Sequence, residues 1–259
     1  MPEVQMNTDY EAIARITKLL KNCKSILFIT GAGISADSGL PTYRGIGGLY
    51  NDKLTEDGIS VEMALAGETL EKRPQVTWKY LSQIEKNCRN ARFNRGHEVI
   101  AEMEKHFERV WVLTQNIDGF HHAAGSRNII DIHGNMHKLV CTSCGWRDVV
   151  KDYSEINIPP LCPKCGRIAR PEVVFFGEML PEDRVAVLER ELTRGFDIYF
   201  SIGTTSVFPY IRQPMVAAKH LGRFTIEINP QDTEISDLVD IKLRMRAAEA
   251  LDAIWKEYN

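Results

Sequence analysis

The chain has 259 residues, of which 44% are hydrophobic and 26% charged, enough for one large domain, or a large and a small one, around a full core. Its net charge of −3 provides no long-range attraction to nucleic acid or to an anionic membrane. No apolar run approaches the roughly 20 residues that span a bilayer, and residues 1–9 lack the basic flank and apolar segment of a secretory signal. We therefore expect a cytoplasmic protein that binds neither nucleic acid nor membranes; the sequence specifies no oligomeric state.

The predicted elements alternate between helices and buried strands. A capping box formed by Thr8 and Glu11, followed by apolar residues at helical spacing, predicts the first helix. Short apolar runs predict strands at residues 25–30, 110–114, 129–132, 197–203 and 224–229, and helical spacing predicts helices at 99–107, 182–192, 209–221 and 247–258. This order is typical of βαβ units, so we expect an α/β fold with a Rossmann-like, mostly parallel sheet.

Two stretches interrupt this alternation and predict a second, smaller lobe. Residues 45–92 are mostly helical in character, and residues 136–170 carry cysteines and short β-like pieces. The large domain would then comprise about 1–44, 93–135 and 171–259, with the small lobe made of a helical insertion and a zinc ribbon. Because ligands of open α/β sheets bind at the carboxyl ends of the strands, we expect the cleft between the lobes to lie over those ends.

A glycine-rich turn follows the first strand. Gly31 and Gly33, with Ala36 in third place, fit the GxGxxG/A pattern that brings backbone close to a pyrophosphate. The acidic ribose partner expected about 20 residues later, at the end of a second strand, is missing. The turn alone is therefore a weak indication of a nucleotide site, because such turns are common.

Polar side chains also follow two later strands. Gln115, Asn116 and Asp118 come directly after residues 110–114, where the alternative interpretation is an ordinary Asx-type turn. His133 follows residues 129–132 and is well placed to act as a general base, although a lone histidine is more often structural and other histidines lie nearby. The position of both groups at strand ends favours a functional role.

Four of the six cysteines form two CxxC pairs, Cys141/Cys144 and Cys162/Cys165, each followed by a glycine. This spacing is typical of a zinc ribbon, whose four thiolates close the coordination sphere of a structural rather than a catalytic Zn²⁺. Two disulfides are the alternative, which a reducing compartment disfavours.

Taken in order, these motifs resemble the sirtuin family of NAD-dependent protein deacylases. The segments that carry the resemblance are Gly31–Gly39 with Leu40-Pro-Thr-Tyr-Arg44, Thr114-Gln-Asn-Ile-Asp118, His133-Gly-Asn135, the four cysteines, Val173-Val-Phe-Phe-Gly-Glu178, Gly203-Thr-Thr205 and Ile228-Asn-Pro230. They span residues 26–249, which is most of the chain. Each motif is weak to moderate by itself, whereas the ordered set is specific.

The resemblance implies a role for each matched position. NAD would contact Gly31, Ala32, Gly33, Ser35, Tyr43, Arg44, Gln115, Asn116, Ile117, Asp118, Gly203, Thr204, Thr205, Asn229, Arg246 and Ala247. His133 would be the general base, assisted by Asn116 at the ribose and Asp118 at the carboxamide. The substrate peptide would add a strand between Gly177-Glu178 and Ser206-Val207. The products would be free lysine, nicotinamide and 2′-O-acyl-ADP-ribose.

The acyl group that the enzyme would prefer is indicated by one departure from the family. Members that remove succinyl or malonyl groups carry a Tyr-x-x-Arg pair in the inserted helix. Here Tyr80 aligns with the tyrosine, but Gln83 stands in place of the arginine. Without the guanidinium a dicarboxylic acyl group has no matching cation, so we expect acetyl or other uncharged acyl groups.

Three other functions are compatible with parts of the sequence. Protein mono-ADP-ribosylation would use the same sugar carbon without a base, and an NAD or ADP-ribose sensor would bind without turnover. His133, Asn116 and Asp118 together favour deacylation over both. A zinc-ribbon nucleic-acid module is disfavoured, because residues 141–170 lack the interleaved basic and aromatic residues of a stacking surface.

Overall fold

The computed structural model describes residues 2–42 and 54–259 as ten helices and nine strands. The helices are α1 (Pro2–Leu20), α2 (Ala32–Ala36), α3 (Val61–Ala64), α4 (Gly67–Lys72), α5 (Pro74–Cys88), α6 (Arg95–His106), α7 (Phe120–Ala123), α8 (Glu182–Arg194), α9 (Pro209–His220) and α10 (Ala247–Tyr258). The strands are β1 (Ser25–Thr30), β2 (Arg109–Thr114), β3 (Ile129–Asp131), β4 (Gly134–Cys141), β5 (Arg147–Val149), β6 (Ala169–Val173), β7 (Ile198–Ile202), β8 (Phe224–Ile228) and β9 (Ile241–Leu243). None of the helices in the described ranges is long and apolar enough to cross a membrane.

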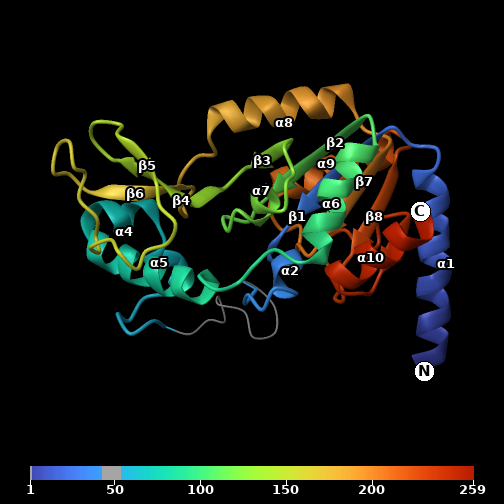
Figure 1. Ribbon diagram of the computed structural model, residues 1–259, viewed down its shortest axis with the longest axis horizontal. Coiled ribbons are helices and arrows are strands. Elements are labelled where there is room, and N and C mark those ends of the chain that lie inside the picture. The colour runs from blue at the N-terminus through green and yellow to red at the C-terminus, as the bar shows by residue number, and fades with distance from the viewer. Residues whose placement is uncertain (1, 43–53) are drawn as a thin grey trace.

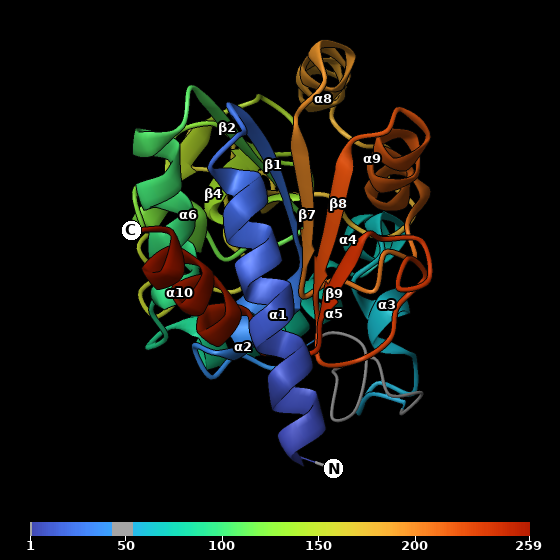
Figure 2. The same cartoon turned by 90° about the vertical axis from the view of Figure 1, so that its right-hand side faces the viewer.

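The large sheet has the order β3-β2-β1-β7-β8-β9, and every neighbouring pair is parallel. Because successive side chains of a strand point to opposite faces, β1 divides its residues between two cores. Ile26 and Phe28 pack with α1, α6 and α10, whereas Leu27 and Ile29 pack with α8 and α9. Figure 2 shows these helices on the two sides of the sheet. The expected Rossmann-like arrangement is confirmed.

The small lobe consists of two parts that pack together, as Figure 1 shows. One is an antiparallel sheet with the order β5-β4-β6, and the other contains α3, α4 and α5. Trp78 of α5 is fully buried between them, and its indole N–H donates a 3.1 Å hydrogen bond to the Ala169 carbonyl at the start of β6. The division of the chain into domains by residue number stays a prediction.

Several elements differ from the sequence prediction: α6 begins at Arg95 rather than at residue 99, and the short helices α2 and α7 were not predicted. Helix α1 begins at Pro2 rather than near Thr8, so the expected capping box does not mark its start. The edge strand β9 was not predicted, because Ile241–Leu243 is too short to show a period. The other predicted strands agree with β1, β2, β3, β7 and β8 within one residue at each end, and the last helix agrees at both ends.

Candidate active site

The carboxyl ends of β1, β2, β3, β7 and β8 open into one cavity of about 540 Å³. Fifteen of the residues singled out from the sequence line it: Gly31, Ala32, Gly33, Gln115, Asn116, Ile117, His133, Gly177, Glu178, Gly203, Thr204, Thr205, Asn229, Arg246 and Ala247. These positions come from segments spread over most of the chain. The structure therefore brings together the turns that a parallel sheet was expected to align.

The glycine-rich turn after β1 lies against the turn after β7. The N–H of Gly33 donates to the Gly203 carbonyl at 2.8 Å, and Gly31 N–H donates to Ile202 at 3.1 Å. A Cβ at Gly33 would lie 2.5 Å from the Cα of Gly203, a separation that backbone atoms cannot tolerate. Glycine is thus required here for contact between two backbones, and the same contact places both turns at the cavity.

Asn116 and Asp118 are fixed by the turn after β1. The Asn116 side-chain amide donates to the Gly31 carbonyl at 3.1 Å and to the Ser35 hydroxyl at 3.2 Å. That hydroxyl donates in turn to a carboxylate oxygen of Asp118 at 2.7 Å, and the other oxygen accepts from Phe120 N–H. Burial raises the pKa of Asp118, while the two hydrogen bonds oppose that change. Ser35 and Asp118 line a smaller pocket, which shares Ala32, Ile84, Asn116 and Ile117 with the main cavity.

His133 lies just beyond β3, and both of its ring nitrogens have a hydrogen-bond partner. Its Nδ1 is 3.1 Å from the Gln115 carbonyl, and its Nε2 is 2.6 Å from the hydroxyl of Tyr210. Burial lowers the pKa of His133 below its usual value, partly opposed by the bond to Gln115, so the ring is neutral at pH 7. Since a carbonyl can only accept, Nδ1 carries the proton and Nε2 carries the lone pair, which accepts from the Tyr210 hydroxyl. The ring is therefore in the form that a general base needs.

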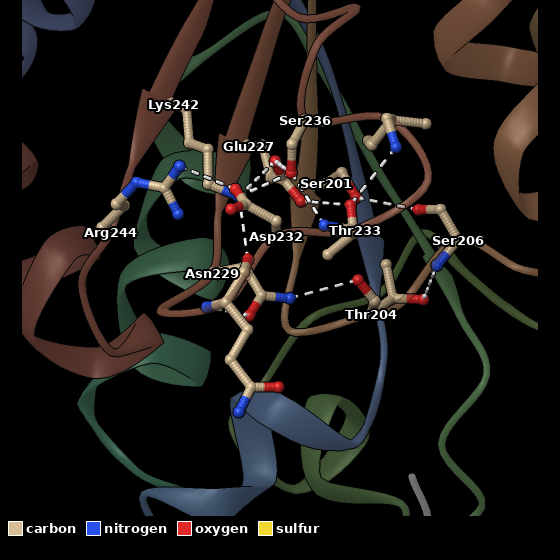
Figure 3. Close-up of polar contacts among 12 residues, drawn as sticks. Ser201, Thr204, Ser206, Glu227, Asn229, Asp232, Thr233, Ser236, Lys242 and Arg244 are labelled. Atoms are coloured by element: carbon tan, nitrogen blue, oxygen red, sulfur yellow. Dashed lines mark hydrogen bonds and ion pairs between the residues drawn. The ribbon is translucent and has the colours of Figure 1, made fainter. Parts of the chain in front are cut away.

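The turn after β8 is held by a buried ion pair, shown in Figure 3. Glu227 of β8 has a side chain that is 1% exposed, and it accepts from Lys242 Nζ at 2.8 Å. It also accepts from the hydroxyls of Thr233 and Ser236, which lie on the turn itself. Asn229, in the same turn, donates from its amide to the Thr204 carbonyl at 3.2 Å. This network fixes the position of Asn229 at the cavity.

Arg246 and Ala247 complete this side of the cavity at the start of α10. The Arg246 guanidinium pairs with Asp37, and Asp37 accepts from the Ala248 N–H at 2.9 Å. The charge of Arg246 is therefore balanced by a neighbour rather than free in the cavity.

The segment after β6 contacts the helical insertion. Phe176 N–H donates to the Leu65 carbonyl at 3.0 Å, and Gly67 N–H donates back to Phe176 at 3.0 Å. Glu178 is paired with Arg170 at 2.5 Å and accepts from Phe175 N–H at 2.9 Å. Glu178 thus braces this segment, which forms one wall of the cavity.

Three of the predicted site residues that the structure describes are not among those that line the cavities. Ser206 is buried with a positive φ of 56°, and Val207 is exposed. Tyr80 is buried, but its hydroxyl donates to Asp57 at 2.6 Å. Gln83, the residue on which the acyl preference was predicted, is exposed on α5 and lines neither cavity. Tyr43 and Arg44 lie outside the described residues.

The four predicted cysteine ligands form one cluster, with all their sulfurs within 4.8 Å of one another. The Sγ atoms of Cys141 and Cys165 are 3.5 Å apart, and those of Cys144 and Cys162 are 3.6 Å apart. A disulfide requires about 2.0 Å, whereas a tetrahedral zinc with Zn–S bonds of about 2.3 Å separates its sulfurs by about 3.8 Å. N–H groups of Cys144 and Ser143 lower the pKa of Cys141 to about 6, which favours the thiolate. The donor set therefore fits one structural Zn²⁺.

The sequence analysis did not identify the apolar wall of the cavity or the aromatic pair beside His133. The apolar wall includes Leu65, Leu81, Ile84, Val173, Phe175 and Leu180. Phe208 and Tyr210 are stacked with centroids 5.5 Å apart, and both rings meet the His133 ring edge-on at 5.9 Å. Their place just after a predicted strand was a signal, but it did not reveal which side chain would reach His133.

The family model described as Sir2 family matches residues 31–209. NAD-dependent protein deacylase 2 of Pseudomonas aeruginosa is 47% identical over 248 residues, covering 95% of this chain and 96% of the relative. NAD-dependent protein deacylase 2 of Pseudomonas syringae pv. tomato is 48% identical over 235 residues, covering 90% of this chain and 94% of the relative.

Solved structures give the same result. A Sir2 homolog–NAD complex matches with a TM-score of 0.84 and 35% identity, covering 94% of this chain and 93% of that one. A Sir2 variant in complex with a deacetylated p53 peptide and 3′-O-acetyl ADP ribose matches with a TM-score of 0.83 and 27% identity, covering 94% and 97%. Both similarities extend over nearly the whole chain.

Proposed function

Because the chain belongs to the Sir2 family, we propose that it is an NAD-dependent protein-lysine deacylase. It removes an acyl group from a lysine side chain and releases nicotinamide, free lysine and 2′-O-acyl-ADP-ribose. The observation that supports this proposal most directly is the position of His133. Its unprotonated Nε2 faces a cavity that is lined by Asn116 and by the turns after β1, β7 and β8.

The cavity has the groups that NAD requires. Its volume of about 540 Å³ is within the range for cofactor sites, and the closely packed Gly33 and Gly203 leave backbone rather than side chains where a pyrophosphate would approach. Asn229 and Arg246 would hold the adenosine side, while Gln115 and Asn116 would hold the nicotinamide ribose. When bound, NAD supplies an electrophilic sugar carbon with nicotinamide as its leaving group.

The residues of the chain orient the reactants and move one proton. Asn116 and Asp118 are locked through Ser35, so the carboxamide-binding carboxylate does not have to reorganise when the ligand arrives. His133 Nε2 accepts the proton of a ribose hydroxyl, and the Gln115 carbonyl stabilises the resulting imidazolium through Nδ1–H. The contacts of Ser35 with Asn116 and Asp118, and of His133 Nδ1 with the Gln115 carbonyl, support these roles.

The zinc ribbon and the inserted helices form the small lobe, whose segment 65–67 pairs with the wall of the cavity at Phe176. The zinc therefore supports this wall and takes no part in the reaction, since four thiolates leave no open position.

The substrates are acylated lysine side chains on peptides or proteins, and the acyl group is uncharged. The apolar wall offers the carbon chain a dry surface, while the charged side chains that line the cavity, Glu178 and Arg246, are already paired with Arg170 and Asp37. Among the residues that the structure describes, a succinyl carboxylate would lose its hydration there without gaining a free cation. The cytoplasmic location and the absence of nucleic-acid partners stay predictions.

Mass spectrometry of purified protein with NAD and matched acetyl-, succinyl- and long-chain-acyl-lysine peptides tests the proposal. We expect loss of the acetyl group only when NAD is present, with nicotinamide and acyl-ADP-ribose formed together. Transfer of an adenine label from NAD onto protein would instead identify an ADP-ribosyltransferase, and NAD binding without turnover would identify a sensor. Preferential removal of succinyl would contradict the predicted acyl preference but leave the deacylase assignment intact.

A further inference from the structure

The hydrogen bond between Tyr210 and His133 has a defined direction. The Gln115 carbonyl cannot donate a hydrogen bond. The one proton of the neutral ring must therefore lie on Nδ1, which donates to that carbonyl. Nε2 is left as an acceptor, and Tyr210 must be the donor across 2.6 Å. Burial raises the pKa of Tyr210 to about 12, so the hydroxyl keeps its proton at neutral pH. In this structure the lone pair that would serve as the base is therefore occupied by the Tyr210 hydroxyl.

We propose that Tyr210 is a positioning residue that holds the His133 lone pair until a ribose hydroxyl of NAD displaces it. This inference rests on the proposed deacylase function. Tyr210 and the ribose hydroxyl are both O–H donors that compete for the same nitrogen. Binding of NAD thus exchanges one donor for another at Nε2, and the base is exposed only when its reactant is present.

The location of Tyr210 allows this exchange. It is the second residue of α9, at the carboxyl end of β7, and its side chain is half-buried rather than part of the core. Its ring lines the same cavity as His133 and stacks on Phe208. The ring packs against the buried cluster between the sheet and α9 without belonging to it, so breaking the bond to Nε2 requires moving a half-buried ring and not a buried one. The Gln115 carbonyl continues to hold Nδ1 during that movement.

The proton balance of the exchange is simple. In the resting state the Tyr210 proton lies between Oη and Nε2 and stays covalently on Oη. During the reaction the ribose hydroxyl gives its proton to Nε2, while Tyr210 keeps its own. His133 then becomes an imidazolium with Nδ1–H on the Gln115 carbonyl.

Three charged side chains on the elements around His133 form ion pairs. Asp131, on the strand that precedes it, contacts Arg184 of α8 at 3.4 Å. Glu178, on the segment after β6, is bound by Arg170, and on α9 Arg212 lies 3.6 Å from Glu234. Among the residues that the structure describes, Tyr210 is the titratable side chain that forms a hydrogen bond with His133. A pH effect of changing Tyr210 therefore reports on this hydrogen bond.

The test is the variant Tyr210→Phe, which keeps the ring and removes the donor. A hydroxyl donor stabilises the neutral form of His133, so its loss raises the pKa of His133 in the enzyme before NAD binds. We measure the pH profile of kcat/KM for NAD at saturating peptide. Its acid limb should shift to higher pH by about half to one unit. We also expect KM for NAD at pH 8 to fall about two- to tenfold, because one competitor is gone. The kcat profile reports the complex in which Tyr210 is already displaced, so it should not move.

Tyr258→Phe is a matched control. Tyr258 also forms a hydrogen bond with a histidine, His106, at 3.0 Å, but this pair lies on α10 and α6 and lines neither cavity. This variant should reproduce the wild-type constants and both pH profiles. A purely structural role for Tyr210 would change neither KM nor the kcat/KM limb in Tyr210→Phe, which would overturn the proposal. A fall in kcat to the level of His133→Ala would also overturn it, because the proton would then pass through Tyr210.

A measurement on the unliganded protein keeps this proposal separate from the proposed function. The ¹⁵N signals of His133, assigned by their loss in a His133 variant, should show a protonated Nδ1 and an accepting Nε2. In Tyr210→Phe the Nε2 signal should shift while Nδ1 stays protonated. A wild-type ring protonated on Nε2 would overturn the inference whether or not the protein deacylates peptides. Lack of deacylation with the expected ¹⁵N pattern would instead count against the proposed function.

Discussion

Gly33 and Gly203 touch through their backbones, with Gly33 N–H 2.8 Å from the Gly203 carbonyl. In Gly33→Ala the new Cβ would lie 2.5 Å from Cα and 2.8 Å from the carbonyl oxygen of Gly203. Backbone cannot move aside as a flexible side chain does, so the two turns must separate. We expect a loss of about 1–3 kcal/mol in the free energy of unfolding and about 10²-fold in kcat/KM for NAD. Urea unfolding and steady-state kinetics measure the two effects.

Gly222→Ala is the comparison for this variant. Gly222 has a φ of 68°, and beyond its chain neighbours no atom would lie within 4 Å of a Cβ there, so the substitution introduces backbone strain without a clash. It should cost about 1 kcal/mol of stability and leave the kinetics unchanged. Wild-type kinetics in Gly33→Ala would show that the contact between the two turns does not determine the NAD site.

The base is tested by His133→Ala. In the proposed mechanism Nε2 takes the ribose proton, so removing the ring should lower acyl removal by about 10²–10⁴-fold while the melting temperature stays close to wild type. Burial lowers the pKa of His133, so the neutral, active ring predominates at pH 7 and wild-type activity should fall only as the pH drops below the usual value near 6.5. The exposed His122 provides a control in His122→Ala. Acyl removal at the normal rate in His133→Ala would exclude this residue as the base.

The strand ends that carry the site were predictable because their signal is local. Runs such as Ser25–Thr30 contain consecutive apolar residues without alternation, and a parallel sheet then brings the residues after them to one edge. His133 was found in this way, whereas the four cysteines were found by their CxxC spacing. The family resemblance supplied their proposed roles, which composition and periodicity do not contain.

Contacts between distant side chains were not predictable. Tyr210 and His133 are 77 residues apart, and their hydrogen bond depends on how α9 packs at the end of β7. Tyr80 was expected at the acyl group, yet in the structure its hydroxyl binds Asp57, which lies in a loop without periodicity. The sequence pattern gives a residue's element and face but not its rotamer, and the rotamer decides which partner it meets.

Removal of the metal should destabilise the antiparallel sheet of the small lobe. Cys162→Ser replaces a buried thiolate by a hydroxyl, which is a poor zinc ligand. We expect the variant to lose its zinc, measured by atomic emission, and to lose hydrogen-exchange protection in β4 and β6. Deacylation should fall as well, although no cysteine of the cluster lines the cavity. Cys23→Ser, which changes a cysteine outside the cluster, should retain zinc and activity. Full protection of β4 and β6 in a zinc-free Cys162→Ser protein would contradict this prediction.

The buried pair Glu227–Lys242 should matter for both stability and NAD affinity. Lys242→Met leaves the carboxylate, whose side chain is 1% exposed, without its cation, and breaking such a pair costs about 3–5 kcal/mol. Because Glu227 also binds the turn that carries Asn229, KM for NAD should rise (Figure 3). The double variant Glu227→Gln/Lys242→Met removes the buried charge and should recover part of the stability but not the affinity. Equal stability of the single and double variants would show that the charge is not what destabilises Lys242→Met.

Acid sensitivity should arise in part from His97. Its ring is fully buried, its Nδ1 accepts from Asn94 N–H, and burial lowers its pKa from 6.5 to about 4. Between these two values the unfolded chain binds a proton that the folded chain does not, so stability falls as the pH drops from 6.5 toward 4. The slope from this residue is at most about 1.4 kcal/mol per pH unit. His97→Asn can keep the hydrogen bond to Asn94 without titrating, so its unfolding free energy should fall less steeply over this range. His220→Asn, at an exposed position on α9, should follow the wild-type slope. If the unfolding free energy of His97→Asn also follows the wild-type slope, the acid sensitivity comes from groups other than His97.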